Sequence, residues 1–142
     1  MCGINGILAP DAARKYAATI STMNQAIRHR GPDGEGSHAA GDIVLGHRRL
    51  AIIDLSDAGH QPMCDQTGHI WVSMNGEIYN FRDLRRELEA EGRVFKTQSD
   101  TEVLVQGFAA WGAEIFSRLE GLFAAAVWDG DNVSIQIGRA HV

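Results

Sequence analysis

The second residue, Cys2, combines a nucleophile with an unusual position. The sequence begins MCGINGILAP, so removal of the initiator methionine would leave Cys2 with a thiol and a free α-amino group on one α-carbon. A free α-amino group titrates at about 8, so part of it is an unprotonated base near neutral pH. Such an amine can take the proton of the thiol without a histidine partner. Cys2 is therefore a candidate nucleophile, the alternative being a small residue with no role near the terminus.

Asn75 and Gly76 could stabilise negative charge on a reacting oxygen. A side-chain amide beside a backbone N–H suits an oxyanion hole, in which one donor contributes about 3 kcal/mol. Asn-Gly is also the dipeptide preferred in tight hairpin turns. From the residues alone we predict a turn between two strands here, and the oxyanion role stays open.

Three charged residues could recognise a small ligand, although each has a simpler explanation. Alternation along the strand-like stretch GHRRLAIID sends Arg48 and Arg49 to opposite faces, so Arg49 could bind a carboxylate or form a surface ion pair. Asp100 falls in the first turn of a predicted helix, where a carboxylate complements the helix dipole. Glu77 could be a solvated charge at a strand edge.

The sequence offers little for a metal or a phosphate group. The six histidines have neither helical nor C-x-x-C spacing with other ligand types, so we expect no metal site. The segment RHRGPDGEG lacks the Gly-Lys-Ser/Thr ending of a phosphate-binding loop and follows a helical segment rather than preceding one. No cofactor is expected for this region.

The elements that must position these residues follow from periodicity and turn signals. Ser99 and Glu102 have capping-box spacing, which predicts the start of a helix that runs through Trp111. The order strands, helices, strands favours an α+β fold rather than alternating βαβ units. The predicted strands lie in INGIL, GSHAAG, IVLGHRRLAIID, HIWVSM and the two halves of GLFAAAVWDGDNVSIQIG, and the helices lie after Pro10, from Phe81 to Leu88 and after Ser99.

Composition limits the classes of protein. The 142 residues are 44% hydrophobic with a net charge of -5, which suits one domain with a core and gives no basic field for nucleic acid or an anionic membrane. No apolar run is long enough for a membrane span, and the first residues lack the layout of a secretory signal. Two widely separated cysteines suit a reducing compartment. We therefore expect a cytoplasmic location.

Eight motifs together resemble a known family. They occur in the order and approximate spacing of the glutaminase domain of glutamine-dependent asparagine synthetases, a class II glutamine amidotransferase of the Ntn-hydrolase (N-terminal-nucleophile) type. The resemblance covers nearly the whole chain. The motifs are MCGI, RHRGPDG, HRRLAIID, QPM, NGEIYN, SDTEV, GLFAAAVWD and IGR.

The resemblance implies a reaction and a site. Cys2 would attack the side-chain amide of L-glutamine and form a γ-glutamyl thioester while ammonia leaves, and water would then release glutamate. Asn75 and Gly76 would form the oxyanion hole, and Arg49 would hold the α-carboxylate of glutamine. Asp100 and Glu77 would surround the α-amino group. The backbone of Leu50, Ile52 and Ile53 would line the pocket.

The resemblance also implies the architecture and the partner. We expect an αββα sandwich of two antiparallel sheets flanked by helices, with residues 1–142 forming a type 2 glutamine amidotransferase domain. Ammonia would pass to a synthetase domain outside these residues, and only that domain would need ATP and magnesium. Ala140 stands where the family usually has an acidic residue, and further strands would normally follow. We therefore expect a C-terminally incomplete domain whose open edge could pair with a second copy as a homodimer.

Two alternatives to this glutaminase stay open. The chain could be a glutamine-binding or assembly module without competent catalysis. It could also be an amidotransferase whose ammonia serves another acceptor, such as a sugar or a peptide.

Overall fold

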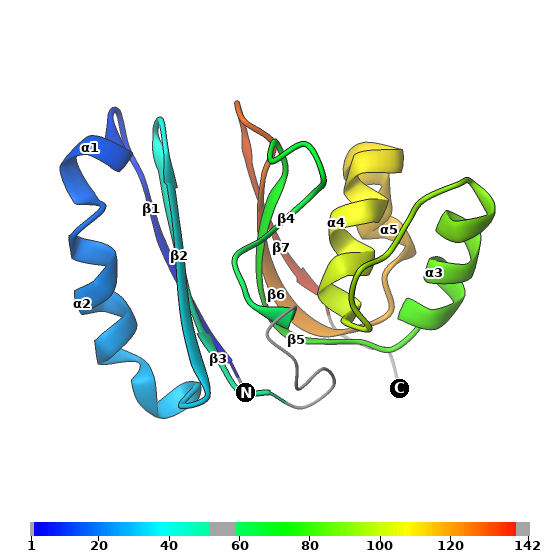
Figure 1. Ribbon diagram of the computed structural model, residues 1–142, viewed down its shortest axis with the longest axis horizontal. Coiled ribbons are helices and arrows are strands. Elements are labelled where there is room, and N and C mark those ends of the chain that lie inside the picture. Colours follow the sequence, from blue (N-terminus) through cyan, green and yellow to red (C-terminus); the bar gives the residue numbers. More distant parts are fainter. Residues whose placement is uncertain (1, 52–58, 139–142) are drawn as a thin grey trace.

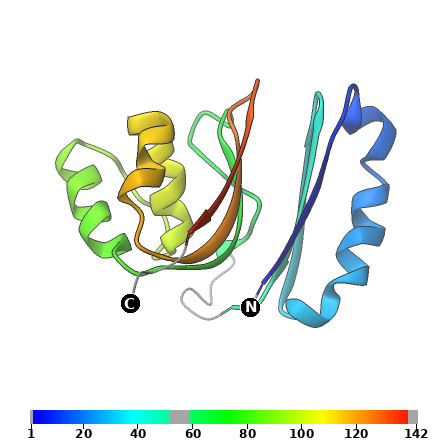
Figure 2. The same cartoon turned by 180° about the vertical axis from the view of Figure 1, so that it is seen from behind.

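The protein is a four-layer sandwich in which two antiparallel sheets face each other and helices cover both outer faces (Figures 1 and 2). The structure is a computed structural model that describes residues 2–51 and 59–138. It confirms the predicted α+β class and the αββα arrangement. The elements are β1 Gly3–Leu8, α1 Ala12–Tyr16, α2 Thr19–Ala26, β2 Gly34–Ala40, β3 Ile43–Arg49, β4 Met63–Cys64, β5 Trp71–Ile78, α3 Phe81–Ala90, α4 Asp100–Trp111, α5 Ile115–Arg118, β6 Gly121–Trp128 and β7 Val133–Gly138, with 3-10 turns at Arg28–Arg30 (η1) and Gly112–Glu114 (η3).

The first sheet has the order β1-β3-β2, so β3 is its central strand. Even-numbered residues of β3 face the helices α1 and α2, where Val44 packs with Ile20 and Ala12 in a small apolar cluster. Odd-numbered residues therefore face the second sheet, because side chains alternate along a strand. The predicted single helix after Pro10 is divided into α1 and α2.

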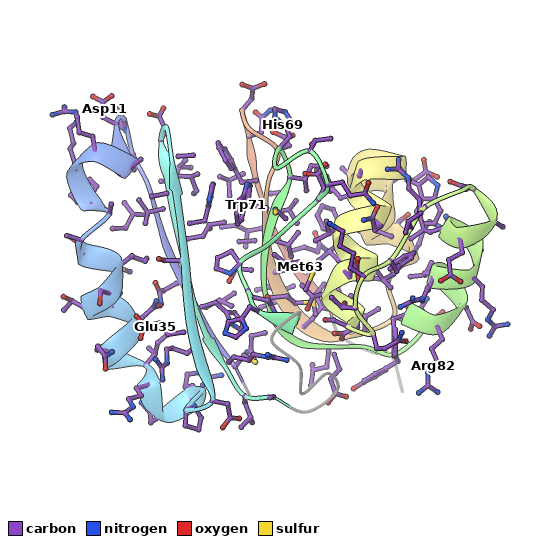
Figure 3. The ribbon with its side chains drawn as sticks, in the orientation of Figure 1. Asp11, Glu35, Met63, His69, Trp71 and Arg82 are labelled. Carbon is purple, nitrogen blue, oxygen red and sulfur yellow. The ribbon has the colours of Figure 1, made fainter. Side chains whose placement is uncertain are left out.

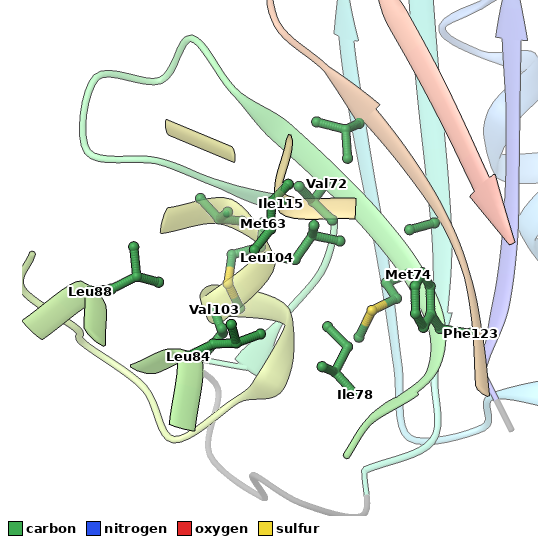
Figure 4. Close-up of a cluster of buried hydrophobic side chains, with 13 residues drawn as sticks. Met63, Val72, Met74, Ile78, Leu84, Leu88, Val103, Leu104, Ile115 and Phe123 are labelled. Atoms are coloured by element: carbon green, nitrogen blue, oxygen red, sulfur yellow. The ribbon is translucent and has the colours of Figure 1, made fainter. Parts of the chain in front are cut away.

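The second sheet has the order β4-β5-β6-β7 and carries the main core. Even-numbered residues of β5 and odd-numbered residues of β6 point toward α3, α4 and α5 (Figure 4). Met74, Phe123 and Leu104 meet in this cluster, and each is at most 4% exposed. The remaining faces of β5 and β6 look toward the first sheet.

The predicted hairpin turn at Asn75-Gly76 is wrong. Both residues lie inside β5, where they pair with Ala124 and Phe123 of β6. Gly76 has a φ of 131°, and a Cβ placed on it would lie 2.1 Å from the carbonyl oxygen of Leu122. The glycine is therefore required by close approach of two strands, not by a turn.

The predicted start of α4 is confirmed, but its capping differs from a full capping box. The Ser99 hydroxyl accepts a hydrogen bond from the N–H of Thr101. The Glu102 carboxylate accepts bonds from the N–H groups of Lys96 and Thr97 instead of reaching back to Ser99. The carboxylate thus holds the segment before the helix, and Asp100 begins the helix itself.

Across residues 2–51 and 59–138, no helix is both long enough and apolar enough to cross a membrane.

Candidate active site

A pocket of about 260 Å³ opens where β1 begins, β3 ends and β5 extends beyond β4. This is the lower end of the sandwich in Figure 1. Ile52 and Ile53, predicted to line it, lie outside the described residues. Every other predicted site residue lines this pocket, namely Cys2, Arg49, Leu50, Asn75, Gly76, Glu77 and Asp100.

The Cys2 thiol is held by the backbone at the end of β3. Its Sγ accepts a hydrogen bond from the N–H of Leu50 at 3.3 Å and approaches the Leu50 carbonyl oxygen at 3.7 Å. The Arg30 guanidinium donates from Nε to the Cys2 carbonyl oxygen at 3.0 Å. The sulfur and the main chain of Cys2 are therefore both held by hydrogen bonds, as a side chain that must be positioned in a site requires.

Alternation on β3 separates the two arginines as predicted. Arg48 turns to the helix side, where its Nη1 pairs with the Glu35 carboxylate at 2.6 Å and its Nε donates to the Gly31 carbonyl oxygen at 2.9 Å. Arg49 turns toward the second sheet and lines the pocket, with 8% of its surface exposed. The pocket therefore contains a guanidinium suited to a carboxylate ligand.

The unpaired edge of β5 supplies the opposite wall. β4 pairs with β5 only at Val72 and Trp71, so Met74, Gly76 and Ile78 lie beyond it on the same edge. The N–H of Met74 donates to Gln61 Oε1 at 2.6 Å, and the N–H of Ile78 donates to Asp100 Oδ2 at 2.9 Å. Because N–H groups of alternate residues on a strand point to the same edge, we infer that the N–H of Gly76, between these two, points to the same side, where Gly76 lines the pocket.

Asn75 adds a buried polar group to this wall. Its side-chain Oδ1 is buried and has no hydrogen-bond partner among the described residues. Burial of an unpaired polar atom costs about 1–3 kcal/mol. A ligand with a polar group at this position would recover that cost.

Asp100 is a carboxylate in a poorly solvated place, at 5% exposure. Burial raises the pKa of its carboxyl, the nearby charge of Glu77 acts in the same direction, and backbone N–H groups including that of Ile78 oppose the rise. An ammonium group beside Asp100 would favour its ionised form. Arg49 thus gives the pocket a cationic group, and Asp100 and Glu77 give it acidic groups, which together complement the carboxylate and ammonium of a free amino acid.

The segment RHRGPDG has a role that sequence reasoning missed. The N–H of Asp33 donates to the Arg49 carbonyl oxygen, and Asp33 Oδ2 accepts from the N–H of Ala51, both at 3.0 Å. A Cβ on Gly31 would lie 2.4 Å from the Arg48 carbonyl group. The segment therefore holds the end of β3 next to Cys2 by hydrogen bonds. In the sequence, only its occurrence among the eight motifs indicated such a role.

His47 and Gln61 were also missed. His47 is fully buried, and its Nε2 donates to the Met74 carbonyl oxygen at 3.0 Å. Burial lowers the pKa of His47 from 6.5 to about 4. No periodic pattern distinguishes either residue, because their contacts join segments far apart in the chain.

No group of three or more His, Cys, Asp or Glu side chains that could hold a metal ion occurs within the part of the chain that the structure describes.

Known proteins match this chain over most of its length. The family described as "Glutamine amidotransferase domain" matches residues 1–142. Asparagine synthetase [glutamine-hydrolyzing] 1 of Bacillus subtilis is 42% identical over 132 residues, which cover 91% of this chain and 21% of that protein. Asparagine synthetase B [glutamine-hydrolyzing] of Escherichia coli is 38% identical over 146 residues, covering 100% of this chain and 26% of that protein. The chain thus spans about a fifth to a quarter of these relatives.

The fold is shared with solved structures. Glutamine phosphoribosylpyrophosphate amidotransferase from B. subtilis matches with a TM-score of 0.73 at 20% identity, covering 96% of this chain and 37% of that one. A structure described as the allosteric regulatory enzyme of purine biosynthesis matches with a TM-score of 0.71. The fold is that of the Ntn hydrolases. The chain belongs to the glutamine amidotransferase domain family.

Proposed function

We propose that this chain is the glutaminase half of an asparagine-synthetase-like enzyme and hydrolyses L-glutamine to L-glutamate and ammonia. The observation that carries the proposal is the single pocket that contains the Cys2 thiol, the Arg49 guanidinium, the Asp100 carboxylate and the Asn75-Gly76 edge. The thiol suits a nucleophile, and the guanidinium suits a site for the α-carboxylate of glutamine. The carboxylate suits a site for its α-ammonium group, and the edge suits an oxyanion site.

The reaction begins once Met1 is removed. The freed α-amine of Cys2 takes the thiol proton, and sulfur attacks the side-chain amide carbon of glutamine. The N–H of Gly76 and the side-chain amide of Asn75 donate to the oxygen that becomes negative. The C–N bond then breaks, the leaving nitrogen takes the proton held by the amine, and ammonia departs from a γ-glutamyl thioester.

Water completes the cycle. The α-amine, now unprotonated, takes a proton from a water molecule that attacks the thioester carbon, and the same oxyanion site receives the second tetrahedral oxygen. Collapse breaks the C–S bond and releases glutamate, while the proton returns to the sulfur. Arg49 holds the α-carboxylate throughout, and Asp100, with Glu77 at the rim, holds the α-ammonium.

The partner is part of this proposal. Relatives of greater length are named asparagine synthetases, which supports transfer of ammonia to an ATP-dependent and magnesium-dependent synthetase domain that makes asparagine. An amidotransferase with another acceptor is the alternative, and an assay of asparagine formation by the full-length protein separates the two. The cytoplasmic location stays a prediction.

Pairing with a second copy is a further element of the proposal. Ile135 and Ile137 on β7 are 74% and 69% exposed, and Leu122 on β6 is 53% exposed. Sedimentation velocity tests this pairing. Detection of monomer alone at high protein concentration would contradict the homodimer.

Replacement of Cys2 tests the glutaminase directly. Cys2→Ala should abolish ammonia release, because no other group in the pocket can form the thioester, and should leave the unfolding midpoint nearly unchanged. Intact mass measurement of the wild type first shows whether Met1 has been removed. Full activity in Cys2→Ala would contradict the proposal.

Calorimetry separates the glutaminase from a binding module. The module predicts glutamine binding without ammonia release in the processed wild type. The glutaminase predicts both, with binding retained in Cys2→Ala.

A further inference from the structure

The backbone of Met74 is held on the edge of β5 by two side chains from elsewhere in the chain. Met74 lies beyond the end of β4, so its N–H and C=O have no neighbouring strand on that side. Gln61 Oε1 accepts from the Met74 N–H at 2.6 Å, and His47 Nε2 lies 3.0 Å from the Met74 carbonyl oxygen. Both backbone groups are therefore satisfied without a strand.

The His47 contact fixes the protonation state of the ring. A carbonyl oxygen only accepts, so Nε2 must carry the hydrogen. The low pKa of His47 keeps the ring neutral near pH 7, so Nδ1 carries no hydrogen. Nδ1 is buried without a hydrogen-bond partner among the described residues, so the Nε2–H bond to Met74 is the ring's one polar contact there.

His47 connects the two sheets next to the pocket without lining it. It precedes Arg49 by two residues and shares the inward face of β3. It does not appear among the residues that line the pocket, whereas Arg49 and Gln61 do. The hydrogen bond to the Met74 carbonyl oxygen is the direct contact through which His47 reaches the strand that forms the pocket wall.

The Met74 carbonyl is directly linked to the oxyanion site. The Met74 C=O and the Asn75 N–H share one planar peptide group. Gly76 is the next residue on the same edge of β5, two positions along. A shift of the Met74 carbonyl would therefore turn the peptide that precedes Asn75 and move the N–H of Gly76.

Gln61 holds the other backbone group of Met74 and is itself fixed. Its Nε2 donates to Thr101 Oγ1 at 3.1 Å at the start of α4. A Cβ on Gly36 would lie 1.9 Å from the Gln61 carbonyl oxygen, so this glycine lets the chain at Gln61 lie against β2. Met74 is thus held between the first sheet and the helical layer.

We propose that His47 is a positioning residue for the oxyanion site, and that its bond to the Met74 carbonyl oxygen holds Asn75 and Gly76 where they stabilise the transition state. The inference rests on the proposed glutaminase function. Oxyanion donors act within a few tenths of an ångström, and misplacement by about 1 Å costs on the order of 100-fold in rate. Glutamine binding through Arg49 and Asp100 does not depend on this bond.

The test is a series of variants assayed for ammonia release in the full chain. His47→Leu removes the donor and should lower kcat at least about tenfold while KM for glutamine changes less than about threefold. His47→Gln offers a donor at similar reach and should recover most of kcat. His47→Asn ends too short for Met74 and should resemble His47→Leu, which keeps the test open if the leucine variant does not fold.

Ser73→Ala is the matched control. Ser73 Oγ also bridges the sheets, by donating to the Gly46 carbonyl oxygen at 3.3 Å, but this bond is not made to the Met74 carbonyl and Ser73 does not line the pocket. Its loss should leave kcat within about twofold, because a neutral buried hydrogen bond contributes only about 1 kcal/mol to stability. Equal losses of kcat in Ser73→Ala and His47→Leu would overturn the assigned role.

Two further outcomes separate the two hypotheses. Unchanged kcat in a folded His47→Leu variant, or a rise in KM alone, would overturn the positioning role and leave the glutaminase intact. A processed wild type that binds glutamine but releases no ammonia would overturn the glutaminase and the role that rests on it. The double variant Cys2→Ala, His47→Leu should still bind glutamine. This result would support a role of His47 in the oxyanion site and not in substrate binding.

Discussion

Asp100 shows how one side chain serves both the fold and the pocket. Its Oδ2 accepts from the N–H of Ile78, which ties the start of α4 to the end of β5. Burial raises the pKa of the same carboxyl, so its ionised form is disfavoured until a cation arrives. An α-ammonium group beside Asp100 would supply that cation and favour the ionised carboxylate.

Asp100→Asn separates the two roles. The amide oxygen can still accept from Ile78, so we expect stability to be kept, while loss of the charge should raise KM for glutamine about 10- to 100-fold. In the wild type, KM should rise as pH falls through the raised pKa, because protonation removes the charge, and the variant should lack this dependence. Initial rates from pH 4.5 to 8 give KM for the wild type and for Asp100→Asn, and the dependence of each KM on pH.

Glu77→Gln is the comparison for Asp100→Asn, because it removes the exposed charge at the rim of the same proposed ammonium site. Glu77 is exposed, so its charge is screened and KM should change less than about threefold. A loss of kcat with unchanged KM in Asp100→Asn would contradict the assignment to the ammonium site.

Strand β5 organises the site because it is longer than its neighbour β4. Along its backbone edge beyond β4, Met74 bonds to the side chains of Gln61 and His47. Gly76 follows and lines the pocket. Ile78 then bonds to Asp100. Because the N–H groups of alternate residues point to the same edge of a strand, the part of β5 that β4 does not cover presents several N–H groups in one direction. The rigid pairing of β5 with β6 along its whole length keeps them in place.

Gly76→Ala tests the close approach within this strand pair. The added Cβ would meet the Leu122 carbonyl oxygen at 2.1 Å on a backbone with φ of 131°, so we expect a loss of about 3–5 kcal/mol in the free energy of unfolding. Gly92→Ala is the control, because Gly92 has a φ of 89° but nothing within 4 Å of the Cβ position. It should cost about 1–2 kcal/mol. Urea unfolding measures both losses of unfolding free energy. A larger loss in Gly92→Ala than in Gly76→Ala would contradict the close approach at Gly76.

At the scale of the molecule, the space between the two sheets differs from the cores outside them. The apolar clusters lie between each sheet and its helices. Between the sheets, hydrogen bonds join His47 to Met74 and Ser73 to Gly46. The ring of Trp71, which is labelled in Figure 3, stacks on the ring of His38 with the centroids 3.6 Å apart. The space between the sheets is therefore mixed in character, because the apolar Ile43 and Leu45 of β3 are buried on this face beside the polar groups.

The buried His47 makes the stability of the sandwich depend on pH. Its pKa is about 4 when folded and 6.5 in the reference state, so the unfolded chain binds a proton that the folded chain rejects. The free energy of unfolding should fall as pH drops from about 6.5 to about 4, by up to roughly 3 kcal/mol at 1.36 kcal/mol per pH unit. The nearby charges of Arg49 and His60 act in the same direction.

Urea unfolding at pH 7 and pH 4.5 measures this dependence. His47→Gln should flatten the change, whereas replacement of the exposed His29 by Gln should leave it as in the wild type. An unaltered pH dependence in His47→Gln would show that another group is responsible.

The sequence by itself determined the coarse order of strands, helices and strands, the α+β class, the opposite faces of Arg48 and Arg49 and the candidate nucleophile. These depend on local periodicity and residue chemistry, which a linear pattern records. Only the tertiary structure decided that Asn75 and Gly76 lie inside a strand, because β6, almost 50 residues later, is what makes glycine necessary there. The roles of Arg30, His47 and Gln61 also needed the fold, since each acts through a hydrogen bond to backbone that the sequence places elsewhere.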